Sequence, residues 1–452
     1  MIANRLGYIK IISALFVIDQ NIMMLLITEG VRMSQQLRLM RERRFLPFFC
    51  TQFLGALNDN VFKTALITMA VFHTSDLTVL DGAVLATLLP GVFILPFFLF
   101  SSTAGQIADK FEKSQLIRLV KIFEVVLMLF AAIGFLFHVF WLLVLALFMM
   151  GIHSTLFGPV KYAYLPQHLA EVELVGGNGV VEMGTFVAIL LGQMIGAGLG
   201  MHQDGELVTG LSIVSLALLG YFASKQIPNA SAAEPNLKIN WNPITETGRN
   251  IAFIWRSQPI WLAIIGISWF WFYGATLLAQ FPVFAKEVLH GDESVFILLL
   301  AVFSVGVGVG SLLCERLSKG TVEIGLVPLG AMGMLAFGVD LYASSASGVA
   351  DLHLLADVGL IGLFGGIYIV PLYALIQSRA QKTHQSRVIA ANNILNAFFM
   401  VLSAVFAMLI FKLGLNIPQL FLITALMSAL VIFYLCFRQP EYFSRMKRLL
   451  NL

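Results

Sequence analysis

Charged side chains are scarce in this sequence. Asp, Glu, Lys and Arg make up 12% of the 452 residues, about half the share that is usual in soluble proteins. Hydrophobic residues make up 59% and the mean hydropathy is +0.88. Such a composition predicts an integral membrane protein. The net charge is only +3 and the basic residues form short clusters, which argues against a nucleic-acid-binding surface.

Cysteine and histidine are also sparse. Cys50, Cys314 and Cys436 are isolated in or beside apolar runs and show no C-x-x-C spacing, so neither a disulfide framework nor a metal site is indicated. The eight histidines are scattered singly, and most lie near expected helix ends. No metal and no cofactor is therefore expected.

Long apolar runs, in contrast, are abundant. About 20 apolar residues cross a hydrocarbon core of about 30 Å. On this basis we expect an all-α membrane protein, a twelve-span bundle of two six-helix halves. The expected spans are 45–72, 82–107, 114–136, 139–164, 177–200, 207–224, 259–286, 294–316, 321–344, 353–378, 388–412 and 418–437.

The longest connection, residues 225–258, follows the sixth span and is rich in proline. It is expected to be a central cytoplasmic linker between an N-terminal half, 45–224, and a C-terminal half, 259–438, with a basic tail at 439–452. When both ends of this core are placed on one side, that side collects 22 Lys and Arg residues and the other side collects two. The positive-inside rule then predicts that both ends are cytoplasmic.

The N-terminal segment, residues 1–44, does not fit this pattern. Its apolar run from Tyr8 to Ile27 is interrupted by Lys10 and Asp19, and it has no small-residue cleavage site. An extra span or a signal-like segment is one interpretation. The preferred one is that the native chain starts at Met33, so that residues 1–32 lie upstream of the true start.

The two halves carry traces of an internal repeat. Asp109-Lys110-Phe111-Glu112-Lys113 after the second span matches Glu315-Arg316-Leu317-Ser318-Lys319 after the eighth, 206 residues later. Gly177-Asn178-Gly179 in the fifth span likewise matches Ala391-Asn392-Asn393 in the eleventh. Two matches at corresponding places indicate a duplication.

One charged group stands in the middle of a span. Asp59 lies near the centre of the first apolar run, between Asn58 and Asn60, with Lys63 four residues further on. A charge at that depth is costly and marks a functional-site candidate. The alternative is that Asp59 and Lys63 neutralise each other on one helix face and only stabilise the helix.

Twelve spans in two halves, together with the loop after the second span, resemble the major facilitator superfamily. Gly105, Asp109, Lys110 and Lys113 fit the G-x-x-x-D-[RK]-x-G-R loop of that family, although Glu112 replaces its second glycine. The resemblance implies that this loop latches the two halves on the cytoplasmic side. With the counterpart in the second half, the expected latch residues are Gly105, Asp109, Lys110, Lys113, Glu315, Arg316 and Lys319; the alternative is a solvated turn that only fixes topology.

Three segments resemble the lysophospholipid transporters more narrowly. They are the run Gln52 to Lys63, the turn Gly158-Pro159-Val160-Lys161-Tyr162, and Asn178 with Glu182. This resemblance implies movement of lysophospholipids, chiefly lysophosphatidylethanolamine, across a bacterial inner membrane, with re-acylation inside by a separate acyltransferase.

Such a substrate needs polar groups along its path. Asp59 could receive the ammonium of the head group, and Lys63 or Lys161 its phosphate. The expected substrate-binding residues are Asn58, Asp59, Asn60, Lys63, Lys161, Asn178 and Glu182. Lys161 is equally well explained as a topology charge, and the alternative for Glu124 in the third span is a bond to a neighbouring helix only.

Two spans carry closely spaced glycines, Gly192, Gly196 and Gly200 in the fifth and Gly306, Gly308 and Gly310 in the eighth. In the resembled fold these spans meet between the halves, which would make the glycines a smooth surface for rocking. The alternative is close packing within one half.

Three functions compete. The leading one is a lysophospholipid transporter; the second is a proton-coupled secondary transporter of a drug or small metabolite; the third is a membrane acyltransferase. The third is weakest, because the only echo of an H-x-x-x-x-D motif is His168 with Glu173, with Glu in place of Asp. We therefore expect a transporter and not an enzyme.

Overall fold

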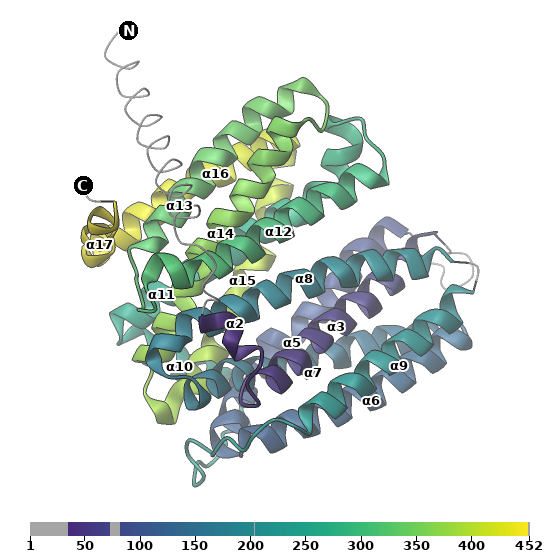
Figure 1. The fold of residues 1–452 in the computed structure, drawn as a ribbon. Coiled ribbons are helices and arrows are strands. Elements are labelled where there is room, and N and C mark those ends of the chain that lie inside the picture. Colours follow the sequence, from purple (N-terminus) through teal and green to yellow (C-terminus); the bar gives the residue numbers. More distant parts are fainter. Residues whose placement is uncertain (1–34, 73–81, 203, 451–452) are drawn as a thin grey trace.

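The computed structural model describes residues 35–72, 82–202 and 204–450 (Figure 1). The interpretation of residues 1–32 as an upstream segment lies outside these residues. Every regular element in the described part of the chain is helical. This follows from the composition, because a backbone in hydrocarbon must satisfy its N–H and C=O groups internally.

The twelve expected spans are confirmed as helices. The largest difference at any helix end is five residues, at the start of the ninth span, which was expected at 321 and lies at Leu326. The spans are α3 (Leu46–Phe72), α5 (Gly82–Lys110), α6 (Lys113–Leu136), α7 (Phe140–His168), α8 (Leu174–Gly200), α9 (Gly205–Ser224), α11 (Gln258–Val283), α12 (Glu293–Ser318), α13 (Leu326–Ser344), α14 (Leu352–Arg379), α15 (Gln385–Lys412) and α16 (Ile417–Arg438).

Eleven of these helices are both long and apolar enough to cross a membrane. The twelfth, α3, has 27 residues, which is also long enough, but the polar residues at its middle lower its hydropathy.

Shorter helices lie outside the bundle. They are α2 (Gln35–Leu39), α10 (Pro243–Trp255) within the linker, and α17 (Glu441–Leu449) within the basic tail. Short η1 (Glu171–Glu173), η2 (Phe284–Val288), η3 (Ser345–Ser347) and η4 (Lys382–His384) adjoin the spans.

Helix pairing in the first half recurs in the second. The pairs α5 with α7, α3 with α8 and α6 with α9 correspond in order to α12 with α14, α11 with α15 and α13 with α16. Contacts between the halves also come in matching pairs, since α8 meets α12 as α15 meets α5. This repetition agrees with the duplication indicated by the sequence.

The two groups of helices lie against each other near α2 and α10 and diverge toward their other ends (Figure 1). The end where they meet carries most of the Lys and Arg residues of the loops, and we call it the basic end. Sequence reasoning assigns it to the cytoplasm.

The glycine prediction was wrong for most of its residues. A methyl group built at Gly192 or Gly196 would lie 2.6 Å from Asn60 Cβ or from the backbone oxygen of Val61, both on α3 in the same half. At Gly310 it would lie 1.8 Å from the backbone oxygen of Leu363 on α14. These glycines therefore bring helices of one half into close contact.

Gly308 alone of the eighth-span glycines faces the other half, where a methyl group would lie 3.3 Å from Met183 Cγ on α8. The sequence could not separate these roles, because spacing does not reveal which way a helix is rotated.

We expect Gly310→Ala to lower stability by about 1–3 kcal/mol, since the added methyl group meets rigid backbone rather than a movable side chain. Gly308→Ala is the matched control, because the Met183 side chain facing it can shift. Thermal unfolding of the purified variants measures the difference. Equal melting temperatures for both variants would contradict the close packing of α12 on α14.

Candidate functional site

A carboxylate ends the second span and reaches across to the other half. Asp109 on α5 accepts hydrogen bonds from the Ser386 backbone N–H and from Arg387 Nε, each at 3.0 Å, at the start of α15. Asp109 is fully buried and the Arg387 side chain is 11% exposed. A negative charge facing a helix N-terminus and a guanidinium is doubly stabilised.

The repeat places a second carboxylate in the corresponding position. Glu315 at the end of α12 faces the start of α8, where its carboxyl carbon lies 3.2 Å from the position of a methyl group built at Gly176. Its Oε1 accepts the backbone N–H of Gln36 on α2 at 3.0 Å. Both acids of the expected latch therefore contact the opposite half or the segment that precedes it.

The other expected latch residues play different parts. Gly105 allows α5 to approach α15, since a methyl group there would lie 2.7 Å from Ala390 Cβ. Lys113 Nζ donates to the Ser231 backbone oxygen, and Lys110 lies over the ring of Phe111. Arg316 is exposed and Lys319 ends α12 with a left-handed backbone.

Sequence reasoning predicted the linker but missed its contacts with the expected latch residues. Glu112, in place of the family's glycine, caps α6 and accepts the backbone N–H of Ala230. Glu234 donates its backbone N–H to the Asp109 backbone oxygen at 2.8 Å, and its carboxylate binds Arg387. Residues 230–234 thus lie against the α5–α6 loop and share the arginine of the latch.

These contacts alter the acidity of Glu112. Burial acts to raise the pKa of its carboxyl, but the N–H groups of Ala230, Gln115 and Ser114 outweigh burial and lower that pKa. The carboxylate is therefore the form that holds the linker, and this contribution is lost when the pH falls far enough to protonate it.

Just inside the latch, a second set of contacts crosses between the halves. Asn178 Nδ2 on α8 donates to Gln377 Oε1 on α14 at 2.5 Å. The rings of Tyr162 and Tyr373 stack with centroids 4.3 Å apart. Asn178 and Gln377 are almost fully buried, so this layer packs tightly beneath the latch.

Lys161 and Glu182 belong to this layer. Tyr162 donates its hydroxyl to Glu182 Oε1 at 2.5 Å, and Lys161 Nζ donates to Thr185 Oγ1 at 3.1 Å. Lys161 is 9% exposed, which is less than a topology charge at a loop would be. The sequence could not predict that Tyr373 contacts Tyr162 or that Gln377 contacts Asn178, because the partners in each pair lie about 200 residues apart in the chain.

The residues around Asp59 separate into two environments. Asn58 Nδ2 donates to Glu124 Oε1 at 2.9 Å, and Glu124 also contacts Lys121 at 2.5 Å and His153 at 3.2 Å. All four side chains are buried between α3, α6 and α7. Asn58 and Glu124 thus belong to a network inside the N-terminal half. For Glu124 this agrees with the alternative of a bond to a neighbouring helix, and for Asn58 it is a structural contact in place of the expected contact with substrate.

Asp59 itself is half-buried and makes a different contact. Its Oδ2 accepts the Ser154 hydroxyl at 2.6 Å, while its Oδ1 is buried and has no hydrogen-bond partner among the described residues. Lys63 Nζ donates to Asn60 Oδ1 at 3.1 Å and lies 5.4 Å from the ring centre of Phe93. Within the described chain, no ion pair of 4.0 Å or less joins Asp59 to Lys63. The mutual neutralisation considered from the sequence therefore does not take the form of a direct ion pair, although the two charges still interact electrostatically.

His168 and Glu173 do not form an acid–base pair. Glu173 is bound by the guanidinium of Arg44 at 2.7 Å, and His168 stacks on Tyr164 at 4.1 Å. These contacts anchor the start of α3 to the α7–α8 connection.

The family assignment follows from comparison with known proteins. The family model described as Major Facilitator Superfamily matches residues 48–404, about four-fifths of the chain. The chain belongs to the major facilitator superfamily. It is accordingly a multi-pass membrane protein of a transporter family, and the expected bundle is confirmed.

Several curated relatives of this superfamily member share the name "Lysophospholipid transporter LplT". The chain is 29% identical to "Lysophospholipid transporter LplT" of Enterobacter sp. (strain 638) over 340 residues, which cover 74% of this chain and 79% of the relative. It is 28% identical to the protein of the same name from Serratia proteamaculans (strain 568), over 75% of this chain and 81% of the relative.

Solved structures share the fold. The fucose transporter FucP in the outward conformation matches with a TM-score of 0.67 at 14% identity, over 88% of this chain and all of that one. The human organic anion transporter MFSD10 matches with a TM-score of 0.70 at 13% identity, over 86% of this chain and 99% of that one. At these identities the likeness concerns the fold alone.

We expect Asp109→Asn to open the basic end, because Arg387 loses its buried counter-charge while Asn still accepts from Ser386. A loss of about 1–2 kcal/mol would change the ratio of closed to open forms roughly tenfold. Spin labels at positions 171 and 382, in exposed loops of the two halves, report the distance across this end.

Glu234→Gln is the matched control for that measurement, because it removes one carboxylate from Arg387 but leaves the Asp109 pair. A smaller shift is expected. If the Asp109→Asn distances were unchanged, the residue would be a topology charge only.

Proposed function

We propose that this chain transports lysophospholipids, lysophosphatidylethanolamine foremost, across a bacterial inner membrane by alternating access. The observation that carries the proposal is the half-buried Asp59 carboxylate at mid-span, with one oxygen unpaired and the Lys63 ammonium one helical turn away. The names of the curated relatives support the same substrate class.

The geometry suits a zwitterionic head group. The ammonium of an ethanolamine lipid can donate to Asp59 Oδ1, and the phosphate can accept from Lys63, with Asn60 beside both. The acyl chain has no need of polar contacts and can remain in lipid or against the apolar helix faces.

The layer of Lys161, Asn178 and Glu182 then acts as the inner barrier of the transport path. Glu182 Oε2 is buried without a hydrogen-bond partner in the described part of the chain. When the layer separates, Lys161 and Glu182 become a second pair of charges toward which the head group can move. A separate acyltransferase on the cytoplasmic side would consume the delivered lipid.

Reconstitution in vesicles tests this function. Lysophosphatidylethanolamine labelled on its head group should cross the membrane faster than in protein-free vesicles. The same experiment with an imposed proton gradient separates the alternative, a proton-coupled exporter of a small metabolite. If the lysolipid did not move under either condition, the proposal would be rejected.

In these vesicles, we expect Asp59→Asn to reduce transport of lysophosphatidylethanolamine roughly tenfold or more, because a hydrogen bond to a charged partner is lost. Lysophosphatidylglycerol, which has no ammonium, should be affected less. Asp204→Asn is the control, because Asp204 is an exposed carboxylate at the end of the bundle opposite to the basic end.

The double variant Asp59→Asn with Lys63→Gln distinguishes binding from structure. If Asp59 served only to balance Lys63, the double variant would recover both stability and transport. A stable protein that still fails to move the zwitterionic lipid is the outcome expected for substrate binding.

A further inference from the structure

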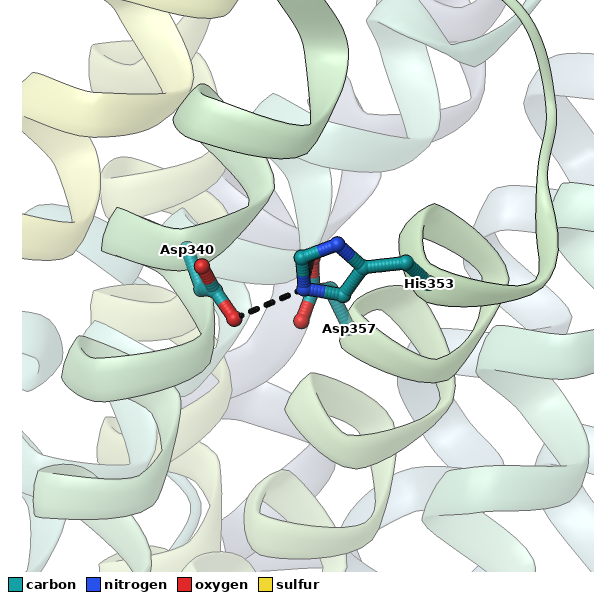
Figure 2. Close-up of side chains that lie close together, drawn as sticks. All are labelled: Asp340, His353 and Asp357. Atoms are coloured by element: carbon teal, nitrogen blue, oxygen red, sulfur yellow. Dashed lines mark hydrogen bonds and ion pairs between the residues drawn. The ribbon is translucent and has the colours of Figure 1, made fainter. Parts of the chain in front are cut away.

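A cluster of three possible metal ligands lies far from the transport residues. Asp340 near the end of α13 faces His353 in the first turn of α14, and Asp357 lies one turn further along α14 (Figure 2). His353 Nε2 is 3.0 Å from Asp340 Oδ2 and 3.8 Å from Asp357 Oδ2. All three ligand atoms lie within 4.8 Å of one another. These helices meet at the end of the bundle opposite to the basic end.

The cluster brings two carboxylates together with one imidazole. Asp357 is 2% exposed, and a buried carboxylate in a membrane span is costly unless a positive group compensates it. Residues 326–377, which cover α13, η3 and nearly all of α14, contain three acidic residues and neither lysine nor arginine. Among the described ion pairs, His353 is the only partner of Asp340 and Asp357.

The surrounding structure holds the ligands in place. The Ser344 hydroxyl donates to Asp357 Oδ2 at 2.8 Å and orients this carboxylate. Asp351 caps α14 by accepting the Leu354 N–H at 2.8 Å, which fixes the turn that carries His353. Supporting contacts of this kind orient ligands in metal sites. The side chains of Asp340 and His353 are 46% and 58% exposed, so an ion can enter from solvent.

We propose that Asp340, His353 and Asp357 bind a divalent transition-metal ion, Zn²⁺ in the first instance, that ties the end of α13 to the start of α14. Zinc bonds of about 2.0–2.2 Å place tetrahedral ligand atoms about 3.3–3.6 Å apart, which lies between the 3.0 Å and 3.8 Å separations of His353 Nε2 from the two carboxylates. One imidazole with two carboxylates favours zinc over magnesium or calcium. Water completes the fourth position.

His353 and Asp357 are four residues apart, which puts them on one helix face. Asp340 comes from the preceding helix, so the absence of a metal expected from the scattered histidines rested on local spacing alone. The proposed site is independent of lysophospholipid transport, and its test requires no transport measurement.

Zinc titration of the full chain, purified without a histidine tag in lipid nanodiscs, tests the proposal by calorimetry. One zinc ion should bind per chain, and the melting temperature should rise with zinc concentration. His353→Gln and Asp340→Asn should each weaken binding by at least about tenfold, the loss that even an outer-shell change commonly causes. Both residues are exposed, so these variants are expected to fold.

Asp351→Asn is the matched control, because it removes a negative charge beside the cluster while Asn can still cap α14. It should bind zinc as the unmodified protein does. Absence of saturable zinc binding would overturn the proposal, and the cluster would then be an imidazole and two acids that share protons. Binding that is equal in the His353→Gln, Asp340→Asn and Asp351→Asn proteins would overturn it too.

Discussion

The contact between the two halves at the basic end depends on carboxylates that face the first turns of helices in the other half. Asp109 meets the start of α15 and Glu315 meets the start of α8. Helix N-termini offer unpaired N–H groups, so an acid placed there gains hydrogen bonds and a favourable dipole at once. Two such contacts, related by the internal repeat, align four helices from both halves. The Asn178–Gln377 and Tyr162–Tyr373 contacts can pack beneath them only while this alignment lasts.

The buried polar groups have distinct tasks that their shared hydrophobic surroundings conceal. Asn58, Lys121 and His153 pair both oxygens of the Glu124 carboxylate, although Asn58 Oδ1 and His153 Nδ1 have no hydrogen-bond partner among the described residues. The groups at Asp59 and Glu182 each keep an oxygen without a partner in the described part of the chain. A carboxylate whose two oxygens are paired holds neighbouring helices together, whereas a carboxylate with an unpaired oxygen favours an incoming donor. This difference is the basis on which Asp59 and Glu182, but not Glu124, are proposed to contact the substrate.

Sequence reasoning succeeded where the signal is local. Hydropathy gave the spans because each helix crosses the membrane by its own composition, and the repeat gave Asp109 and Glu315 as equivalent positions. It failed where partners are distant in the chain. Arg387 is 278 residues from Asp109, and Gln36 is 279 from Glu315, so no spacing rule could pair them. The role of Glu112 likewise became apparent only from its contact with Ala230. A loop pattern shows that an acid replaces the family's glycine, but it does not show that this acid caps a helix and binds the linker.

The linker contact at Arg387 has a consequence for the pathway of opening. Glu234 is tethered on both sides, so it is presented to the guanidinium at an effective concentration of about millimolar order or above. Because the Glu234 backbone N–H is also bonded to the Asp109 backbone oxygen, the linker and α5 present both acids to the arginine together. Under the proposed alternating access, opening would have to part Arg387 from two carboxylates at once, which raises the electrostatic barrier between the two states.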